Sequence, residues 1–152
     1  MTLPPIVTVT DVQDQLLCDF PEEILSKVEI YTFASAANHF SRPTSKDLEF
    51  PFLRTTNTAP FGCVEHFANE GDFVSQFGVI GNAPTPPADL APGSPIPVLN
   101  GHFGGRIFLR RGHTGHLFNA HYVNPADSIL DDPEVRRHSN LIKYLDGGSV
   151  AK

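Results

Sequence analysis

The chain has 152 residues, a formal net charge of −6 at pH 7, and 18% charged against 40% hydrophobic residues. Its few Lys and Arg residues do not form the basic cluster that nucleic-acid binding needs, and two cysteines cannot build a disulfide framework. No stretch approaches the roughly 20 apolar residues of a membrane span, and the N-terminus lacks a signal-peptide pattern, so we expect a cytoplasmic protein.

Residues that break regular structure are frequent, with 14 prolines and 12 glycines. The large apolar residues are mainly 12 phenylalanines, which are scattered between these breakers instead of forming periodic runs. Isolated aromatic side chains fit pockets on a partner as readily as they fill a core. The composition therefore predicts a single chain that is mostly irregular or extended, with a few short α-helices and room for one β-hairpin, and not a standard compact domain.

The N-terminal part predicts one short strand and one helix. Residues 6–10 (IVTVT) alternate β-branched side chains, as strands do. A helical segment is predicted over residues 20–37, with Asp19 as N-cap and Pro21 in the first helical position. Residues 30–33 (IYTF) either continue this helix or switch to a strand, because periodicity does not separate the two in a short apolar run.

The middle of the chain reads as two irregular segments around a short helix. Residues 41–62 contain three prolines and are predicted to be an extended arm. Residues 72–80 predict one or two helical turns, capped by Asp72 and ended by Gly81. Residues 82–101 contain six prolines and are predicted to be a semi-rigid, polyproline-like spacer.

The C-terminal part predicts a hairpin and a helix. Within residues 102–123, residues 107–111 and 116–123 are expected to pair around a Gly-His-Thr-Gly turn. Residues 132–146 predict the clearest helix, with Asp132 as cap and Pro133 in the first position. Its apolar stripe includes Leu141, which we expect to dock on a partner.

Two constellations are compatible with metal or nucleophilic chemistry, and the nucleophilic one would pair Cys63 or Cys18 with a histidine and an acid. Cys63-x-x-His66 and His113-x-x-His116 supply four side chains of zinc-ligand type, although the two pairs are further apart than in small zinc modules. The alternative interpretation makes Cys63 a small buried hydrophobic residue and the two later histidines turn residues. No nucleophile elbow, phosphate loop, dinucleotide fingerprint or HExxH helix is present. We therefore expect no catalytic residue, no metal site and no cofactor.

A third constellation consists of aromatic anchors spaced by turn-forming residues. Phe52 and Phe61 flank the turn Arg54-Thr55-Thr56-Asn57, in which Thr and Asn side chains can hydrogen-bond their own backbone. Residues 53–62 (LRTTNTAPFG) resemble the first motif of the piercer-of-microtubule-wall family, small proteins inside the doublet microtubules of cilia. Residues 73–81 (FVSQFGVIG) are similar to the second motif of that family.

The resemblance implies a non-catalytic structural protein that binds tubulin and neighbouring axonemal proteins, without nucleic acid or membrane, and stabilises the ciliary axoneme. The expected partner-binding residues are those of the two motifs and of the C-terminal stripe: Phe52, Arg54, Thr55, Thr56, Asn57, Phe61, Gly62, Phe73, Phe77 and Leu141. Two alternatives remain open. One is a capsid-associated structural protein, and the other is a small zinc domain or enzyme that uses Cys63, His66, His113 and His116.

Overall fold

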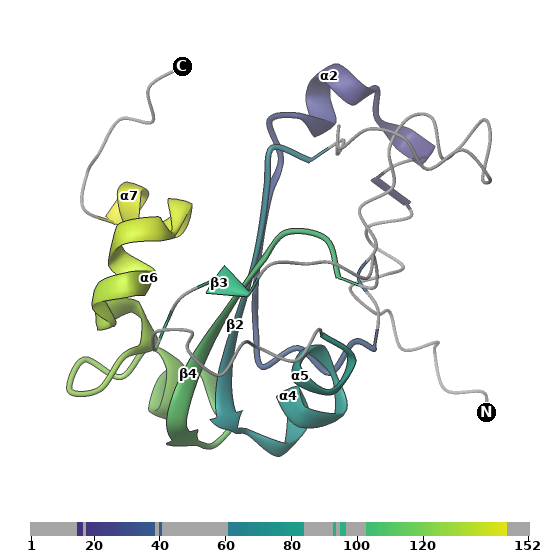
Figure 1. Ribbon diagram of the computed structural model, residues 1–152. Coiled ribbons are helices and arrows are strands. Elements are labelled where there is room, and N and C mark those ends of the chain that lie inside the picture. The colour runs from purple at the N-terminus through teal and green to yellow at the C-terminus, as the bar shows by residue number, and fades with distance from the viewer. Residues whose placement is uncertain are drawn as a thin grey trace, which may run out of the picture.

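The computed structural model describes residues 15–16, 18–38, 40, 61–83, 93, 95–96 and 103–145 (Figure 1). The predicted strand at residues 6–10, residues 41–60 of the predicted arm and most of the predicted spacer lie outside these residues. Strands and helices make up about 27% and 41% of the described part, so regular structure dominates it.

A four-stranded sheet forms the centre of the protein, in the order β1-β2-β4-β3. Strands β1 (Glu29–Phe33), β2 (Cys63–Gly71) and β4 (Arg106–Thr114) are parallel, and the short β3 (Pro95–Ile96) is antiparallel to β4. The helices are short: α2 (Glu22–Leu25), α4 (Phe73–Phe77), α5 (Val79–Asn82), the π-helix η1 (Phe118–Tyr122), the 3-10 helix η2 (Ile129–Asp131), α6 (Pro133–His138) and α7 (Asn140–Leu145). In Figure 1, α6 and α7 lie on one side of β2 and β4, and α4 and α5 on the other.

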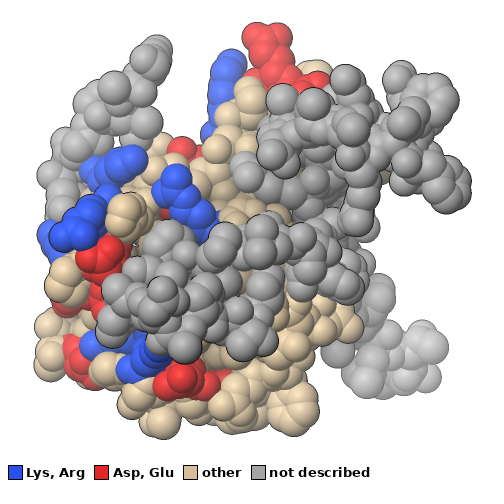
Figure 2. Space-filling view, viewed as in Figure 1, with Lys and Arg blue, Asp and Glu red and all other residues tan. Residues whose placement is uncertain are grey.

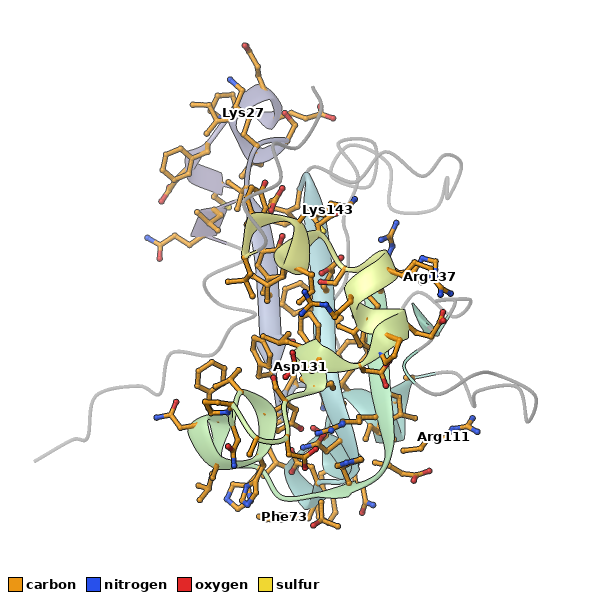
Figure 3. The ribbon with its side chains drawn as sticks, turned by 90° about the vertical axis from the view of Figure 1, so that its left-hand side faces the viewer. Lys27, Phe73, Arg111, Asp131, Arg137 and Lys143 are labelled. Carbon is orange, nitrogen blue, oxygen red and sulfur yellow. The ribbon has the colours of Figure 1, made fainter. Side chains whose placement is uncertain are left out.

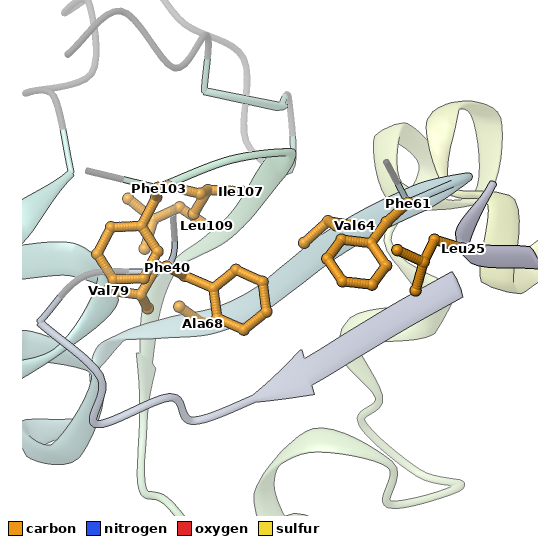
Figure 4. Close-up of a cluster of buried hydrophobic side chains, with 9 residues drawn as sticks. All are labelled: Leu25, Phe40, Phe61, Val64, Ala68, Val79, Phe103, Ile107 and Leu109. Atoms are coloured by element: carbon orange, nitrogen blue, oxygen red, sulfur yellow. The ribbon is translucent and has the colours of Figure 1, made fainter. Parts of the chain in front are cut away.

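Side chains alternate between the two faces of the sheet and build two hydrophobic clusters. The first cluster contains Leu25, Phe40, Phe61, Val64, Ala68, Val79, Phe103, Ile107 and Leu109 (Figure 4). The second cluster contains Phe67, Phe108, Tyr122, Ile129, Val135 and Ile142. Because β2 contributes to both clusters, all of its side chains from Cys63 to Asn69 are buried. A parallel sheet covered on both faces is the usual solution for strands of this kind.

The predicted fold class, mostly irregular and not a compact domain, is wrong for the described residues. The phenylalanines that looked isolated in the sequence converge in space: Phe67 stacks between Phe33 and Phe108, with ring centroids 4.7 Å and 5.2 Å away. Long-range strand pairing therefore gathers these rings into a core.

The predicted helix over residues 20–37 is wrong beyond its first turn. Helix α2 spans Glu22–Leu25, follows Pro21 and has no side-chain cap, whereas Asp19 was the expected cap. Residues 29–33 form β1, which is the strand alternative left open by the sequence. The β-branched and aromatic residues of β1 pack better on a pleated surface than in a helix.

The predicted hairpin within residues 102–123 is also wrong. Arg106–Thr114 forms one strand that runs through the expected turn and pairs in parallel with β2. Residues 118–122, expected as the second strand, form the π-helix η1. Gly112 and Gly115 both have positive φ, at 73° and 89°, but the chain leaves the sheet only after Thr114.

The two other helix predictions hold in part. Asp72 caps α4 as predicted, but Gly81 lies inside α5 instead of ending the helix. Asp132 caps α6 with Pro133 in the first turn, as predicted. The predicted helix over 132–146 is interrupted at Ser139, which is extended (φ −77°, ψ 134°) and separates α6 from α7.

Charged residues on the described surface pair locally. Figure 2 shows basic and acidic side chains interspersed on one side of the molecule. Arg137 and Glu134 are 2.6 Å apart, Arg136 and Asp131 are 3.5 Å apart, and Arg110 pairs with Asp127. No described helix is long and apolar enough to cross a membrane.

Candidate functional site

A buried polar network lies where β2 ends. Asp72 follows β2 and caps α4, because its Oδ1 accepts a hydrogen bond from the Val74 amide at 2.9 Å. Its Oδ2 accepts from the Tyr122 hydroxyl at 2.6 Å and from the Ser75 hydroxyl at 3.1 Å. The side chains of Asp72, Ser75 and Tyr122 are fully buried. In open α/β sheets ligands bind outside the carboxyl ends of the strands. This network therefore stabilises the edge of the sheet at which a binding site is expected.

Tyr122 links this edge to the segment that follows β4. Its hydroxyl oxygen accepts a hydrogen bond from the backbone amide of Asn69 at 3.0 Å, while the hydroxyl group donates to Asp72. Burial raises the pKa of Tyr122, and the hydrogen bond to Asp72 raises it further. The hydroxyl therefore stays protonated and remains a donor.

Asn69 continues the network on the same edge. Its side-chain nitrogen donates to the carbonyl oxygens of His121 at 3.0 Å and Gly115 at 3.4 Å. Its Oδ1 atom is buried and has no hydrogen-bond partner among the described residues. Asn69 and Tyr122 together hold residues 115–122, which carry His116 and His121, against the end of β2.

Large apolar side chains are exposed around this network. Phe73 and Phe77 of α4 are 56% and 82% exposed, and Leu117 is 56% exposed. The His116 ring meets Phe73 edge to face, with centroids 4.8 Å apart. We call Phe73, Phe77, His116 and Leu117 the carboxyl-edge surface. Figure 3 places Phe73 beyond the ends of β2 and β4.

A second buried polar group lies near the opposite, amino end of the strands. The Glu65 carboxylate accepts from the Ser139 hydroxyl at 2.7 Å and from the backbone amide of Asn140 at 2.9 Å. The guanidinium of Arg106 lies 3.9 Å from the same carboxylate. Glu65 and Ser139 are fully buried. These bonds explain the interruption between α6 and α7, because a continuous helix would use the Asn140 amide internally.

Cys63 lies beside this group and is a poor nucleophile. Its Sγ accepts a hydrogen bond from the Asn140 side chain at 3.2 Å. Burial raises the pKa of the Cys63 thiol, and the nearby Glu65 carboxylate raises it further. Because the thiolate is the reactive form, this environment favours a structural role for Cys63.

His66 is a buried structural histidine on the other face of β2. Its Nε2 lies 3.0 Å from the Gly104 carbonyl, which can only accept, so Nε2 carries the proton. Its Nδ1 then accepts from the Thr32 hydroxyl at 2.7 Å. The rings of Phe40 and Phe103 pack around the imidazole, and burial lowers the pKa of His66 to about 4.

The zinc alternative is not supported by this geometry. Cys63 and His66 are three residues apart in one strand and point to opposite faces. His113 and His116 lie at the carboxyl end of β4, roughly 25 Å along the sheet from Cys63 at about 3.3 Å per residue. Among the described residues, no group of three or more His, Cys, Asp or Glu is placed to hold a metal ion.

A polar hollow of about 330 Å³ lies beside the end of β4. Its charged lining residues are Arg110, Arg111, His113, Asp127, Asp131 and Asp132. The hydrogen bond from Arg110 lowers the pKa of Asp127, and His113 lies 3.6 Å from the same carboxylate. Charges of both signs are therefore already paired across this hollow.

The predicted partner-binding residues fall into three groups. Phe73 and Phe77 are exposed on α4. Phe61 is 2% exposed in the first cluster and Leu141 packs against the second, so both contribute to the core. Gly62 supports the same core, because a Cβ atom there would lie 2.4 Å from the Ser26 carbonyl oxygen. The remaining predicted residues lie outside the described part: Phe52, Arg54, Thr55, Thr56 and Asn57.

Sequence reasoning missed most of the buried polar network. Asp72 was recognised as a helix cap, but Asn69, Ser75 and Tyr122 were assigned no role. No local pattern marks them, because the partner of Asp72 lies 50 residues away at Tyr122. The one usable signal was the polar residues within 63–70, which are unusual for a strand buried on both faces.

Comparison with known proteins gives no relative for this chain. No protein-family model matches it, and no curated protein or solved structure is similar to it.

Proposed function

We propose that this protein is a non-catalytic binding component of a larger assembly, which docks through the carboxyl-edge surface. The observation that carries the proposal is the exposure of Phe77, 82%, next to Phe73 on the same face of α4. Exposed apolar clusters on an otherwise well-packed domain mark interaction sites. Burying one such ring contributes about 1.5–3 kcal/mol to association.

The specific partner that we propose is tubulin of ciliary doublet microtubules, together with neighbouring axonemal proteins. Support comes from the sequence resemblance, whose second motif, residues 73–81, contains both exposed rings. The first motif lies largely outside the described residues, and Phe61 within it is a core residue. The proposal therefore places the tubulin contact on α4 and not on Phe61.

A co-sedimentation assay with microtubules tests this proposal. Phe77→Ser should weaken binding about thirtyfold, since truncating an interfacial aromatic anchor costs about 2 kcal/mol. Phe20→Ser is the matched control, because Phe20 is 45% exposed but lies before α2. If the parent does not co-sediment, tubulin is not the partner. If both variants bind like the parent, α4 is not the contact.

A second candidate function is an acid–base site at the same edge. One observation favours it: the fully buried Asp72 carboxylate is hydrogen-bonded to Tyr122, whose segment carries two histidines. Histidines near a buried carboxylate are frequent acid–base groups, and here the hydrogen bonds of Tyr122 and Asn69 connect Asp72 to the segment that carries the histidines. His121 Nδ1 accepts from the Leu117 amide at 3.0 Å, so its Nε2 carries the proton in the neutral form.

Hydrolysis of chromogenic esters separates this candidate from the binding function. If an acid–base site operates here, His116→Ala or His121→Ala abolishes turnover, whereas His138→Ala on α6 keeps it. A parent without turnover on such substrates, in a preparation that binds microtubules, favours the binding function.

A further inference from the structure

We propose that two copies of this chain associate through the outer edge of β1, which extends the sheet across a two-fold axis. β1 is the last strand on its side of the sheet, and β2 is its only strand partner among the described residues. An edge strand presents unpaired N–H and C=O groups that template pairing with another chain. This interface is separate from the carboxyl-edge surface and does not depend on the proposed function.

The outward backbone groups of β1 belong to alternate residues, Glu29, Tyr31 and Phe33. In a parallel pair, alternate residues direct both N–H and C=O to the same neighbour. The Val28 carbonyl accepts from the Gly62 amide at 2.9 Å, and the Ala34 amide donates to the Phe67 carbonyl at 3.1 Å. Even-numbered residues therefore bond to β2, and the odd-numbered residues face away from it.

Glu29 is the one charged side chain of β1, and β1 lacks the lysines and prolines that commonly protect an edge strand. Residues 29–33 (EIYTF) contain no Lys, Arg or Pro. The carboxylate of Glu29 already accepts from the hydroxyls of Tyr31 at 2.5 Å and Tyr144 at 2.8 Å. Every side chain of β1 is only half-buried, whereas the neighbouring β2 is buried from Cys63 to Asn69. A parallel strand with apolar residues on both faces is normally covered more completely.

Exposed apolar residues flank both ends of β1 on one face. Tyr144 and Leu145 of α7 are 49% and 62% exposed, and Tyr144 reaches the amino end of β1 at Glu29. Phe118 of η1 is 50% exposed and meets Phe33 at the carboxyl end, with centroids 5.0 Å apart. Figure 3 shows α7 towards one end of the sheet and the segment of η1 towards the other.

A second copy fits this edge because the edge is self-complementary. A two-fold axis through Tyr31, perpendicular to the sheet, pairs Tyr31 with its symmetry mate and Glu29 with Phe33 of the other copy. These are the outward-facing residues, so about six backbone hydrogen bonds form. The same axis exchanges the two ends of β1 and brings Leu145 of one copy beside Phe118 of the other. The contact is closed and isologous, as in most homodimers.

Charge also favours this arrangement over a parallel one. In the two-fold pair the two Glu29 residues are offset by four positions, about 14 Å along the strands, which exceeds the Debye length of about 8 Å at physiological ionic strength. A parallel pairing in register would bring these carboxylates to about 5 Å from each other. The antiparallel two-fold pair therefore avoids like-charge contact.

Sedimentation velocity and amide hydrogen exchange test the proposal on the full chain. At concentrations up to about 100 µM, where a micromolar dimer saturates, we expect a dimer. In the dimer the Tyr31 amide should be protected along with those of Ile30 and Thr32. In a monomer, Tyr31 should exchange quickly while its two neighbours stay protected. A chain that stays monomeric over this range, or a dimer with a fast-exchanging Tyr31 amide, overturns the proposal.

A charge-exchange pair keeps the test independent of folding. Leu145→Glu should weaken the dimer at least tenfold, and adding Phe118→Lys should restore most of the loss, because the two positions meet only across the interface. Both residues are exposed in the single chain, so its fold should be retained. Phe73→Glu is the control and should dimerise like the parent. If the double variant is as weak as Leu145→Glu, the two-fold geometry is wrong.

Discussion

Replacing Tyr122 by Phe removes one oxygen from the centre of the buried network and leaves the ring in place. The hydroxyl group donates to Asp72 at 2.6 Å, and its oxygen accepts from the Asn69 backbone amide at 3.0 Å. A hydrogen bond to a charged group contributes about 1.5–3 kcal/mol, and an unsatisfied buried donor costs about 1–3 kcal/mol. We therefore expect a loss of about 3 kcal/mol in the free energy of unfolding, or roughly 10 °C in Tm for a chain of this length.

Urea unfolding followed by circular dichroism measures this loss, with Tyr144→Phe as the matched control. Tyr144 loses the same atom, but it is 49% exposed, and among the described residues its hydroxyl bonds the half-buried Glu29 alone. The control should cost less than about 1 kcal/mol. If Tyr122→Phe is as mild as Tyr144→Phe, the network around Asp72 does not stabilise the carboxyl edge as we argue.

Three further predictions concern His66, Ser139 and Gly105. The folded pKa of His66, about 4, lies below its unfolded value of 6.5. Neutral His66 therefore contributes about 3 kcal/mol to the free energy of unfolding above pH 6.5, and this contribution is lost as the pH falls towards 4. Urea midpoints of the parent should fall over this window, and those of His66→Gln should fall less. Ser139→Ala should cost about 2 kcal/mol, because the buried Glu65 carboxylate loses a donor, and thermal unfolding at neutral pH measures it. Gly105→Ala should be more destabilising than Gly112→Ala. Both glycines have positive φ, but only at Gly105 would the new Cβ lie 2.2 Å from a carbonyl oxygen. Calorimetry of the two variants measures the difference, and equal losses would contradict the close contact.

The features that the sequence predicted correctly depend on neighbours within one helical turn. Asp72 before α4 and Asp132-Pro133 before α6 are visible because a cap and the amide that it binds are two or three residues apart. The placement of Phe73 and Phe77 on one side of α4 follows from the same short helical period. Local chemistry of this kind does not change with the fold around it.

The sheet could not be predicted because its stabilising contacts join distant residues. Glu65, His66 and Asn69 make β2 look like a polar loop, yet each hydrogen-bonds a group far along the chain. His66 binds Gly104, 38 residues away, and Glu65 binds Ser139, 74 residues away. Sequence periodicity does not indicate such long-range pairings. The prediction of a mostly irregular fold therefore rested on the proline and glycine content. The apolar residues of β4 were recognised as a strand, but its partner, β2, was not.

The order of the strands also has a consequence for the rate of folding. β1 and β2 pair residues 29 and 63, and β2 and β4 pair residues 65 and 106, so the chain must close loops of 34 and 41 residues before the sheet stabilises anything. Domains dominated by such non-local pairings fold in milliseconds to seconds, whereas small helical bundles fold in microseconds to milliseconds. Until β2 is inserted between its neighbours, the phenylalanines of both clusters remain accessible to other chains. Newly synthesised copies should therefore depend on chaperones more than a helical protein of equal length.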